Sequence, residues 1–187
     1  TYCVGHGACK AACPEDAITL VFGTEKRGVD IPLVNPNFET NVPGMFIAGE
    51  LGGMGLIRNS VEQGRQAMES IAKLKGIGQG QGLDVVIVGA GPAGFAASLA
   101  AMERKLRFVT LEQDTLGGTM AHFPRGKVVM TAPMNLPLYG KVKRTETRKE
   151  ALLERGQKGQ TATGLKINEG WRVEEILTRG VVFVVRT

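Results

Sequence analysis

Asp84-Val85-Val86-Ile87-Val88-Gly89-Ala90-Gly91-Pro92-Ala93-Gly94 is the stretch that decides the fold. Its first half is a short, β-branched, apolar run, which is typical of a buried strand. A helix-forming run, FAASLAAMERK, follows at 95–105, and a second apolar run, LRFVTLE, fills 106–112. This order predicts a strand, turn, helix and strand in an α/β fold.

The glycines between the first strand and the helix follow the pattern G-x-G-x-x-G. Gly89 permits the tight turn, Gly91 lets the backbone approach a pyrophosphate, and Gly94 lets helix and strand pack closely. Pro92 and Ala93 open the helix, where the missing N–H of proline costs little. The free N–H groups and the dipole of this helix N-terminus attract phosphate. The motif therefore predicts a Rossmann-like, dinucleotide-binding βαβ unit.

Glu112 ends the second strand, about 20 residues after the glycines. A carboxylate at this place accepts hydrogen bonds from ribose hydroxyls and repels a 2′-phosphate. Glu112 therefore favours FAD or NAD over NADP as the ligand. The alternative is a glycine-rich turn in an unrelated α/β domain.

Residues 84–150, with GAGPAG, LEQ, LGGT and HFPRGK, resemble the N-terminal FAD-binding part of thioredoxin-reductase-like pyridine nucleotide oxidoreductases. The resemblance implies that FAD is the cofactor. It also implies that the loop with Gly117, Gly118 and Thr119 belongs to the cofactor site, and that His122 lies near the flavin. A partly exposed loop histidine is the alternative for His122.

Residues 39–72, ETNVPGMFIAGELGGMG and the residues after it, resemble the second, C-terminal flavin motif of the same superfamily. The resemblance implies that the carboxylate of Glu50 contacts the ribityl chain and that the next helix N-terminus faces the cofactor. Gly49 is a further expected residue of the cofactor site. The family usually has Asp where this chain has Glu50. An ordinary surface acid after a buried strand is the alternative.

The C-terminal flavin motif precedes the N-terminal one, which is the reverse of the order in a single reductase. Either the chain spans the junction of two fused reductase modules, or its two halves form one permuted flavin domain. We favour the junction, because the chain begins without a methionine and ends in an apparent strand. Four regions are then expected: an incomplete ferredoxin-like segment at 1–34, the C-terminal flavin motif at 35–75, a linker at 76–83 and an incomplete Rossmann portion at 84–187.

Further elements follow from apolar patterns and glycines. We expect a buried strand at 45–48 and a helix after Gly55 that Gly76 caps. Another helix is expected at 147–155. Two strands are expected around 172–177 and 181–186.

The first 13 residues contain all three cysteines, in the spacing Cys3-x-x-His6-x-x-Cys9-x-x-x-Cys13-Pro14. Such clustering disfavours a disulfide framework and favours a metal site. The run resembles that of bacterial ferredoxins, with His6 where the family has a second cysteine. The resemblance implies a 4Fe-4S cluster held by Cys3, Cys9 and Cys13, with His6 as a candidate ligand. Zinc on this Cys₃His set, or a site that has lost its metal, are the alternatives.

The composition indicates which classes of partner the chain suits. A net charge of +5 suits an acidic cofactor or partner, while 5% aromatic residues argue against base-stacking surfaces for nucleic acid. No apolar run approaches a membrane span, and no export signal opens the chain. We therefore expect a cytoplasmic protein. A basic run could attract an acidic partner or is simply a solvated face; it consists of Lys141, Lys143, Arg144, Arg148 and Lys149. A redox protein is a further expected partner.

Together the resemblances imply a flavin-dependent oxidoreductase that passes electrons between NAD(P)H, FAD and an iron–sulfur module. No second G-x-G-x-x-G occurs, so the chain has no separate nicotinamide domain. No Cys-x-x-Cys lies near the flavin motifs, and no residue stands out as catalytic. The alternatives are a cofactor-binding module without turnover and an NAD-binding domain without flavin.

Overall fold

The computed structural model describes residues 11–14, 32–52, 56–130, 133–142, 147–180 and 182–187. The chain divides into two compact units, Thr1–Asp30 and Ile31–Thr187. In the first unit, Cys13 is a free, half-buried cysteine. The other predicted metal ligands, Cys3, His6 and Cys9, lie outside the described residues, so the cluster stays a prediction.

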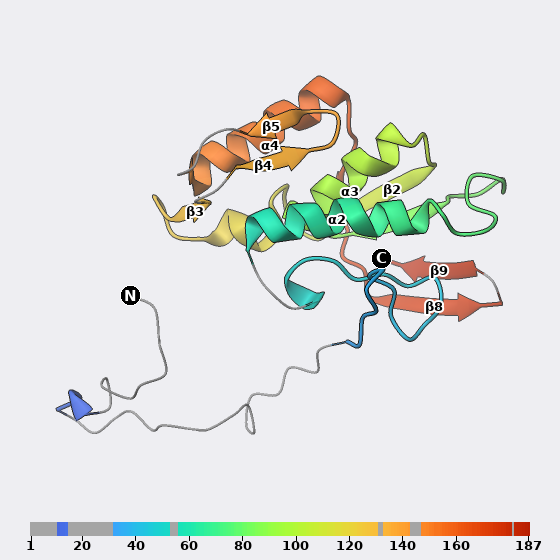
Figure 1. The fold of residues 1–187 in the computed structure, drawn as a ribbon, viewed down its shortest axis with the longest axis horizontal. Coiled ribbons are helices and arrows are strands. Elements are labelled where there is room, and N and C mark those ends of the chain that lie inside the picture. The colour runs from blue at the N-terminus through green and yellow to red at the C-terminus, as the bar shows by residue number, and fades with distance from the viewer. Residues whose placement is uncertain (1–10, 15–31, 53–55, 131–132, 143–146, 181) are drawn as a thin grey trace. The chain divides into compact units, whose positions relative to one another are not determined.

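A parallel sheet of three strands, in the order β1-β2-β7, forms the centre of the second unit. Strand β1 (Val85–Val88) pairs with β2 (Phe108–Glu112), which pairs with β7 (Asn168–Glu169). Helix α3 (Pro92–Glu103) connects β1 to β2 (Figure 1). The predicted α/β fold and its βαβ unit are therefore confirmed.

Helix α3 is covered on two sides. One side faces the sheet, and helix α2 (Ile57–Ile71) packs along the other, as Figure 1 shows. This double cover explains why the sequence of α3 is apolar around the whole helix. The core between these elements contains Met68, Ile71, Ile87, Ala97, Ala100 and Ala101.

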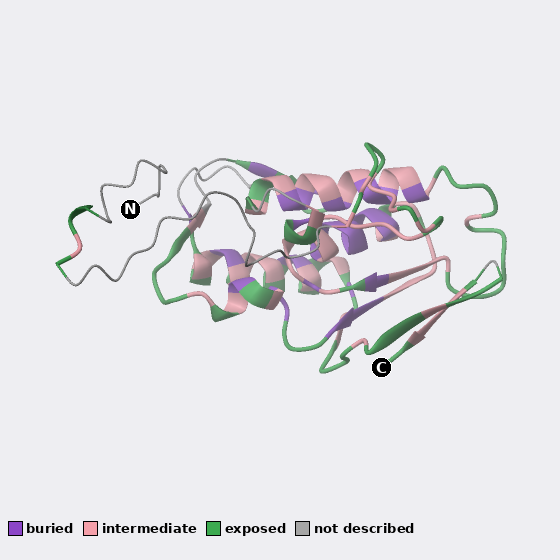
Figure 2. Ribbon diagram, turned by 90° about the horizontal axis from the view of Figure 1, so that it is seen from below, coloured by how far each residue is buried: buried purple, intermediate pink, exposed green. Residues whose placement is uncertain are grey.

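A second core cluster lies between α3, helix α4 (Lys149–Thr163) and the hairpin of β4 (Met134–Leu136) and β5 (Gly140–Val142). The short helix η2 (Gly118–His122) closes it, with Met120 buried. Strands β3 (Val128–Met130) and β6 (Thr147–Arg148) pair beside it. Figure 2 shows the buried residues on the faces that these helices turn to one another.

The two strands expected near the C-terminus are confirmed. They are β8 (Glu175–Arg179) and β9 (Val182–Arg186), and they pair as an antiparallel hairpin. Most of their side chains are exposed or half-buried (Figure 2). The helix expected at 147–155 is present as α4, which begins at Lys149 and continues to Thr163, whereas Thr147 and Arg148 form β6.

Two local expectations were wrong. Residues 45–48 are half-buried but form no strand, because only Phe46 makes a bridge, to Glu39. Helix α2 ends at Ile71 with Ala72 as its cap, so Gly76 belongs to a later turn. The short helix η1 (Glu50–Gly52) lies between these two features.

Residues 76–83 form turns that are held to the domain. The N–H of Gly78 donates to Asp84 Oδ1 at 2.9 Å, and Ile77 packs against the core. None of the helices in the described part of the chain has the length and apolar character of a membrane span.

Candidate dinucleotide-binding site

The glycine loop joins β1 to α3, and its three glycines differ in their surroundings. Gly89 has φ +95°, a conformation that favours glycine. A Cβ on Gly94 would lie 1.9 Å from the carbonyl oxygen of Gly89. A Cβ on Gly91 would lie 3.9 Å from its nearest neighbour, the carbonyl oxygen of Gly117. Gly89 and Gly94 are thus required by the fold, whereas the space beside Gly91 is open to a ligand.

The N-terminus of α3 has the features of an anion site. Gly91 is the N-cap residue, and no side chain caps the helix. Pro92 begins the helix, and its first backbone bond runs from the N–H of Phe95 to Gly91 O at 2.8 Å. The N–H groups of Ala93 and Gly94 therefore have no side-chain acceptor and suit a phosphate.

Glu112 lies at the end of β2 and is only 3% exposed. Its Oε2 accepts the N–H of Ala90 at 2.6 Å, and its Oε1 accepts the N–H of Asp114 at 3.0 Å. The carboxylate therefore ties the glycine loop to the turn that follows β2. Each oxygen has a second lone pair, so the predicted ribose contact remains chemically open.

The loop at 116–119 lies on the glycine loop. The N–H of Gly117 donates to Ala90 O at 3.0 Å, and a Cβ on Gly118 would lie 3.4 Å from Gly91 Cα. Gly117 has φ +105°, which again favours glycine. Thr119 is exposed. The structure thus brings Gly117 and Gly118 to the predicted site and leaves Thr119 at the surface.

His122 ends η2 and forms an exposed pair with Asp114, with 2.5 Å between His122 Nε2 and Asp114 Oδ2. Lys149 Nζ donates to the carbonyl oxygens of Ala121 and Phe123. These contacts fasten both ends of the loop that covers the glycine motif.

The segment with Gly49 and Glu50 lies against the same helix N-terminus. Gly49 is buried, has φ +93°, and donates its N–H to Gln63 Oε1 on α2 at 2.8 Å. A Cβ on Gly49 would lie 3.0 Å from Ala93 Cβ. Glu50 is exposed. The two flavin-like motifs are therefore neighbours within one compact unit, whereas the junction account that the sequence favoured puts them in different sites.

Sequence analysis missed two residues of this crossing, Gln63 and Gly64. A Cβ on Gly64 would lie 2.1 Å from Ala93 O, so α2 and α3 touch through their backbones. Gly64 falls on the stripe of buried residues with Val61 and Met68. A glycine on an apolar helix stripe was the signal that could have revealed the contact.

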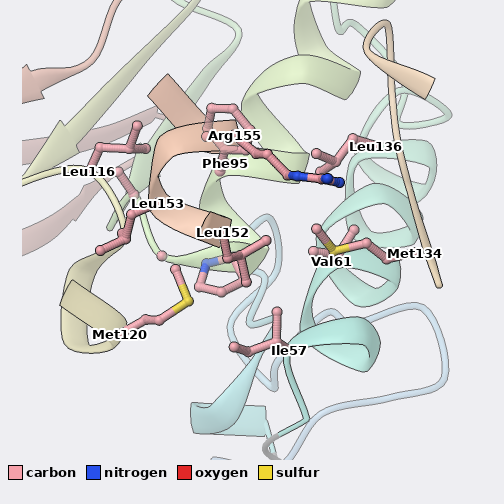
Figure 3. A pocket seen from close by; sticks show the side chains of 15 residues that line it. Ile57, Val61, Phe95, Leu116, Met120, Met134, Leu136, Leu152, Leu153 and Arg155 are labelled. Atoms are coloured by element: carbon pink, nitrogen blue, oxygen red, sulfur yellow. The ribbon is translucent and has the colours of Figure 1, made fainter. Parts of the chain in front are cut away.

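One hollow borders the glycine loop, and a second hollow shares Val61 and Met134 with it. The first, drawn in Figure 3, is apolar and has Gly91 and Pro92 in its lining, with Arg155 as its one charged side chain. The second is the more polar of the two, and residues of α2 and residues at the start of β4 line it. Its polar lining residues are Arg58, Asn59, Glu62 and Asn135.

No group of three or more His, Cys, Asp or Glu side chains among the described residues is placed to hold a metal ion. Because Cys3, His6 and Cys9 lie outside that part of the chain, this finding does not bear on the predicted cluster.

Solved structures of reductases are similar to part of the chain. Bacillithiol disulfide reductase Bdr (YpdA) from Staphylococcus aureus and the same enzyme from Bacillus cereus are each 16% identical to the chain, with a TM-score of 0.47 over 54% of this chain and 32% of theirs. A ferredoxin-flavin thioredoxin reductase from Clostridium acetobutylicum is 20% identical, with a TM-score of 0.42 over 56% of this chain and 32% of its own. The chain thus spans about a third of the length of these structures.

No curated protein matches the chain. A family match covers the glycine loop, α3, β2 and the segment through α4, which is less than half of the chain. Residues 84–163 match the family whose description is FAD binding domain.

Proposed function

We propose that residues 31–187 bind one FAD molecule across both motifs, in a protein that acts as a flavin-dependent oxidoreductase. The observation that carries the proposal is the contact of Gly49 with Ala93, next to the glycine loop of the segment that matches the FAD binding domain family. The contact supports the permuted arrangement over the junction of two modules. A single cofactor can then reach Glu50 and Glu112 from one place.

The residues of the site fit the parts of FAD. Its pyrophosphate would lie at Gly91 and the uncapped N-terminus of α3, where backbone N–H groups meet anions. Its adenosine ribose would lie towards Glu112, and its ribityl chain towards Glu50. The flavin ring would extend towards the first turn of α2, where the two hollows meet at Val61 and Met134.

Bound FAD would supply the redox chemistry by accepting and releasing electrons, while the protein binds and orients it. The polar hollow suits the hydrogen-bonding edge of the ring, with amides from Asn59 and Asn135 and the guanidinium of Arg58. The apolar hollow, lined by Phe95, excludes water from its other side.

We further propose that NAD(P)H is the electron donor and that the Cys3, His6, Cys9 and Cys13 set holds an iron–sulfur cluster as a relay. The ferredoxin-like spacing of these residues supports the cluster. Anaerobic purification followed by iron and acid-labile sulfide analysis tests it. Stoichiometric iron and sulfide are expected, and stoichiometric zinc would contradict the relay.

The flavin proposal is tested by titrating the purified chain with FAD and following the quenching of flavin fluorescence. We expect saturable binding, and an absorbance spectrum with two visible bands after removal of free FAD. Binding of NAD but not of FAD would replace the proposal with that of a nicotinamide-binding domain.

A further inference from the structure

The turn that carries Glu50 is held in place by a side chain of α2. The buried N–H of Gly49 donates to Gln63 Oε1 at 2.8 Å, across 14 residues of sequence. A buried N–H without an acceptor is costly, so this bond contributes to fixing the turn. Gln63 itself is half-buried, and the hydrogen bond described for its side chain is the one to Gly49.

Gln63 also stands at the crossing of α2 with α3. Its neighbour Gly64 lets the backbone of α2 approach Ala93 O, and Gly49 lies against the side chain of Ala93. Three segments therefore meet at Ala93, which is in the first turn of α3. The position of the Glu50 turn relative to the phosphate-binding N–H groups depends on this meeting point.

We propose that Gln63 is a positioning residue that, by accepting the N–H of Gly49, aligns Glu50 with the N-terminus of α3 so that both reach one FAD. The inference rests on the proposed function and adds the residue that joins the two halves of the site. Gln63 acts through the Gly49 backbone, and the cofactor itself is contacted by the segment that Gln63 holds.

Three variants separate this role from general stability. Gln63→Leu keeps the size of the side chain and removes the acceptor, while Gln63→Glu keeps an acceptor oxygen. Gln66→Leu is the matched control, because Gln66 is also half-buried on α2 but donates to Glu62 and does not touch Gly49. If Gln63→Leu does not fold, Gln63→Ala takes its place.

Each variant is titrated with FAD and with ADP. ADP contains only the part of FAD that the glycine loop and Glu112 would hold, so it does not depend on the Glu50 turn. We expect Gln63→Leu to weaken FAD binding about tenfold, which is 1.4 kcal/mol, and to leave ADP binding within twofold. Gln63→Glu and Gln66→Leu are expected to bind both ligands as the unchanged chain does.

A double-mutant cycle with Glu50→Ala completes the test. If Gln63 acts by placing Glu50, the double variant binds FAD no more weakly than Glu50→Ala alone. Equal losses of FAD and ADP affinity in Gln63→Leu, or no loss of either, overturn the inference while the flavin proposal stands. Failure of the unchanged chain to bind FAD defeats the flavin proposal first, and the inference with it.

Discussion

Two regions around α3 contain glycines for opposite reasons. At the crossing of α2, α3 and β1, backbones touch: a Cβ would lie 2.1 Å from Ala93 O at Gly64 and 1.9 Å from Gly89 O at Gly94. On the outer face of the glycine loop, a Cβ on Gly91 would have no neighbour nearer than 3.9 Å. Protein atoms fill the space beside the glycines of the crossing, whereas the space beside Gly91 is open.

Because of this difference, we expect substitutions at the crossing to change the stability of the fold and substitutions at Gly91 to change ligand binding. A side chain added at the crossing must push two backbones apart, because the atoms it meets cannot rotate away. A Cβ added at Gly91 comes only to an ordinary contact distance from Gly117 O, and the side chain would occupy the space of a phosphate. The following changes test the contrast, from the largest expected effect to the smallest.

Gly64→Ala should destabilise the protein most, by about 3 kcal/mol or more, since overpacking a close backbone contact has costs of this order. A loss of stability would point to the close backbone contact, because alanine in a helix normally stabilises it relative to glycine by about 1 kcal/mol. Urea denaturation measures the change. Gly82→Ala, at a position with nothing within 4 Å, is the control and should change stability little. A Gly64→Ala variant as stable as the control would refute the close crossing.

Gly91→Val should leave folding nearly intact and weaken FAD binding at least 100-fold, about 2.7 kcal/mol. The valine methyl groups would fill the place of the pyrophosphate. Fluorescence titration measures the affinity, and the urea midpoint reports the fold. Affinity within threefold of the unchanged chain, in a folded variant, would show that the glycine motif does not bind the dinucleotide.

Glu112→Ala should cost about 1–3 kcal/mol of stability, because it leaves the N–H groups of Ala90 and Asp114 without their acceptor. Glu112→Gln keeps one acceptor oxygen and should lose less. Denaturation with and without FAD separates the loop-holding role from a contact with ribose. Equal stability of the alanine variant and the unchanged chain would contradict the first role.

The βαβ unit was predictable because its signals are local. The glycine spacing, the β-branched run and the helix formers occur in order along 84–112, and the structure has β1, α3 and β2 there. The strand β7 was not predictable, since Asn168 and Glu169 are polar and join the sheet only through pairing with β2.

Residues 45–48 are a case in which a local pattern led to a wrong prediction. Their apolar composition predicted a strand, but apolar side chains favour burial and do not supply a pairing partner. In the site, Glu112 and Gly91 followed from motif spacing. Gln63 did not, because its bond to Gly49 depends on how α2 folds back over 14 residues.

The smallest effect is expected away from the site, at Asp84. Hydrogen bonds from the side chain and the backbone of Arg107 hold the pKa of Asp84 well below its ordinary value. Because the folded pKa is lowered, the stabilisation is present above the unfolded value of about 3.9 and is lost as the pH falls towards the folded pKa.

Asp84→Asn should therefore lower the Tm at pH 7, and the difference from the unchanged chain should shrink below about pH 4. Thermal unfolding at a series of pH values measures this. A difference that stays constant from pH 7 to pH 3 would contradict the ion pair's contribution. FAD affinity at pH 7 should not change, because Asp84 precedes β1, at the end of the strand remote from the glycine loop.

The central claim is that one FAD spans both motifs, and FAD titration of the chain with and without Glu50→Ala tests it most directly. We predict one FAD per chain with micromolar or tighter affinity, weakened about tenfold, or 1.4 kcal/mol, by Glu50→Ala although Gly91 and Glu112 are intact. Tight binding that is identical in the two proteins would contradict the claim. Glu50 would then belong to a different flavin site, as the junction of two modules requires.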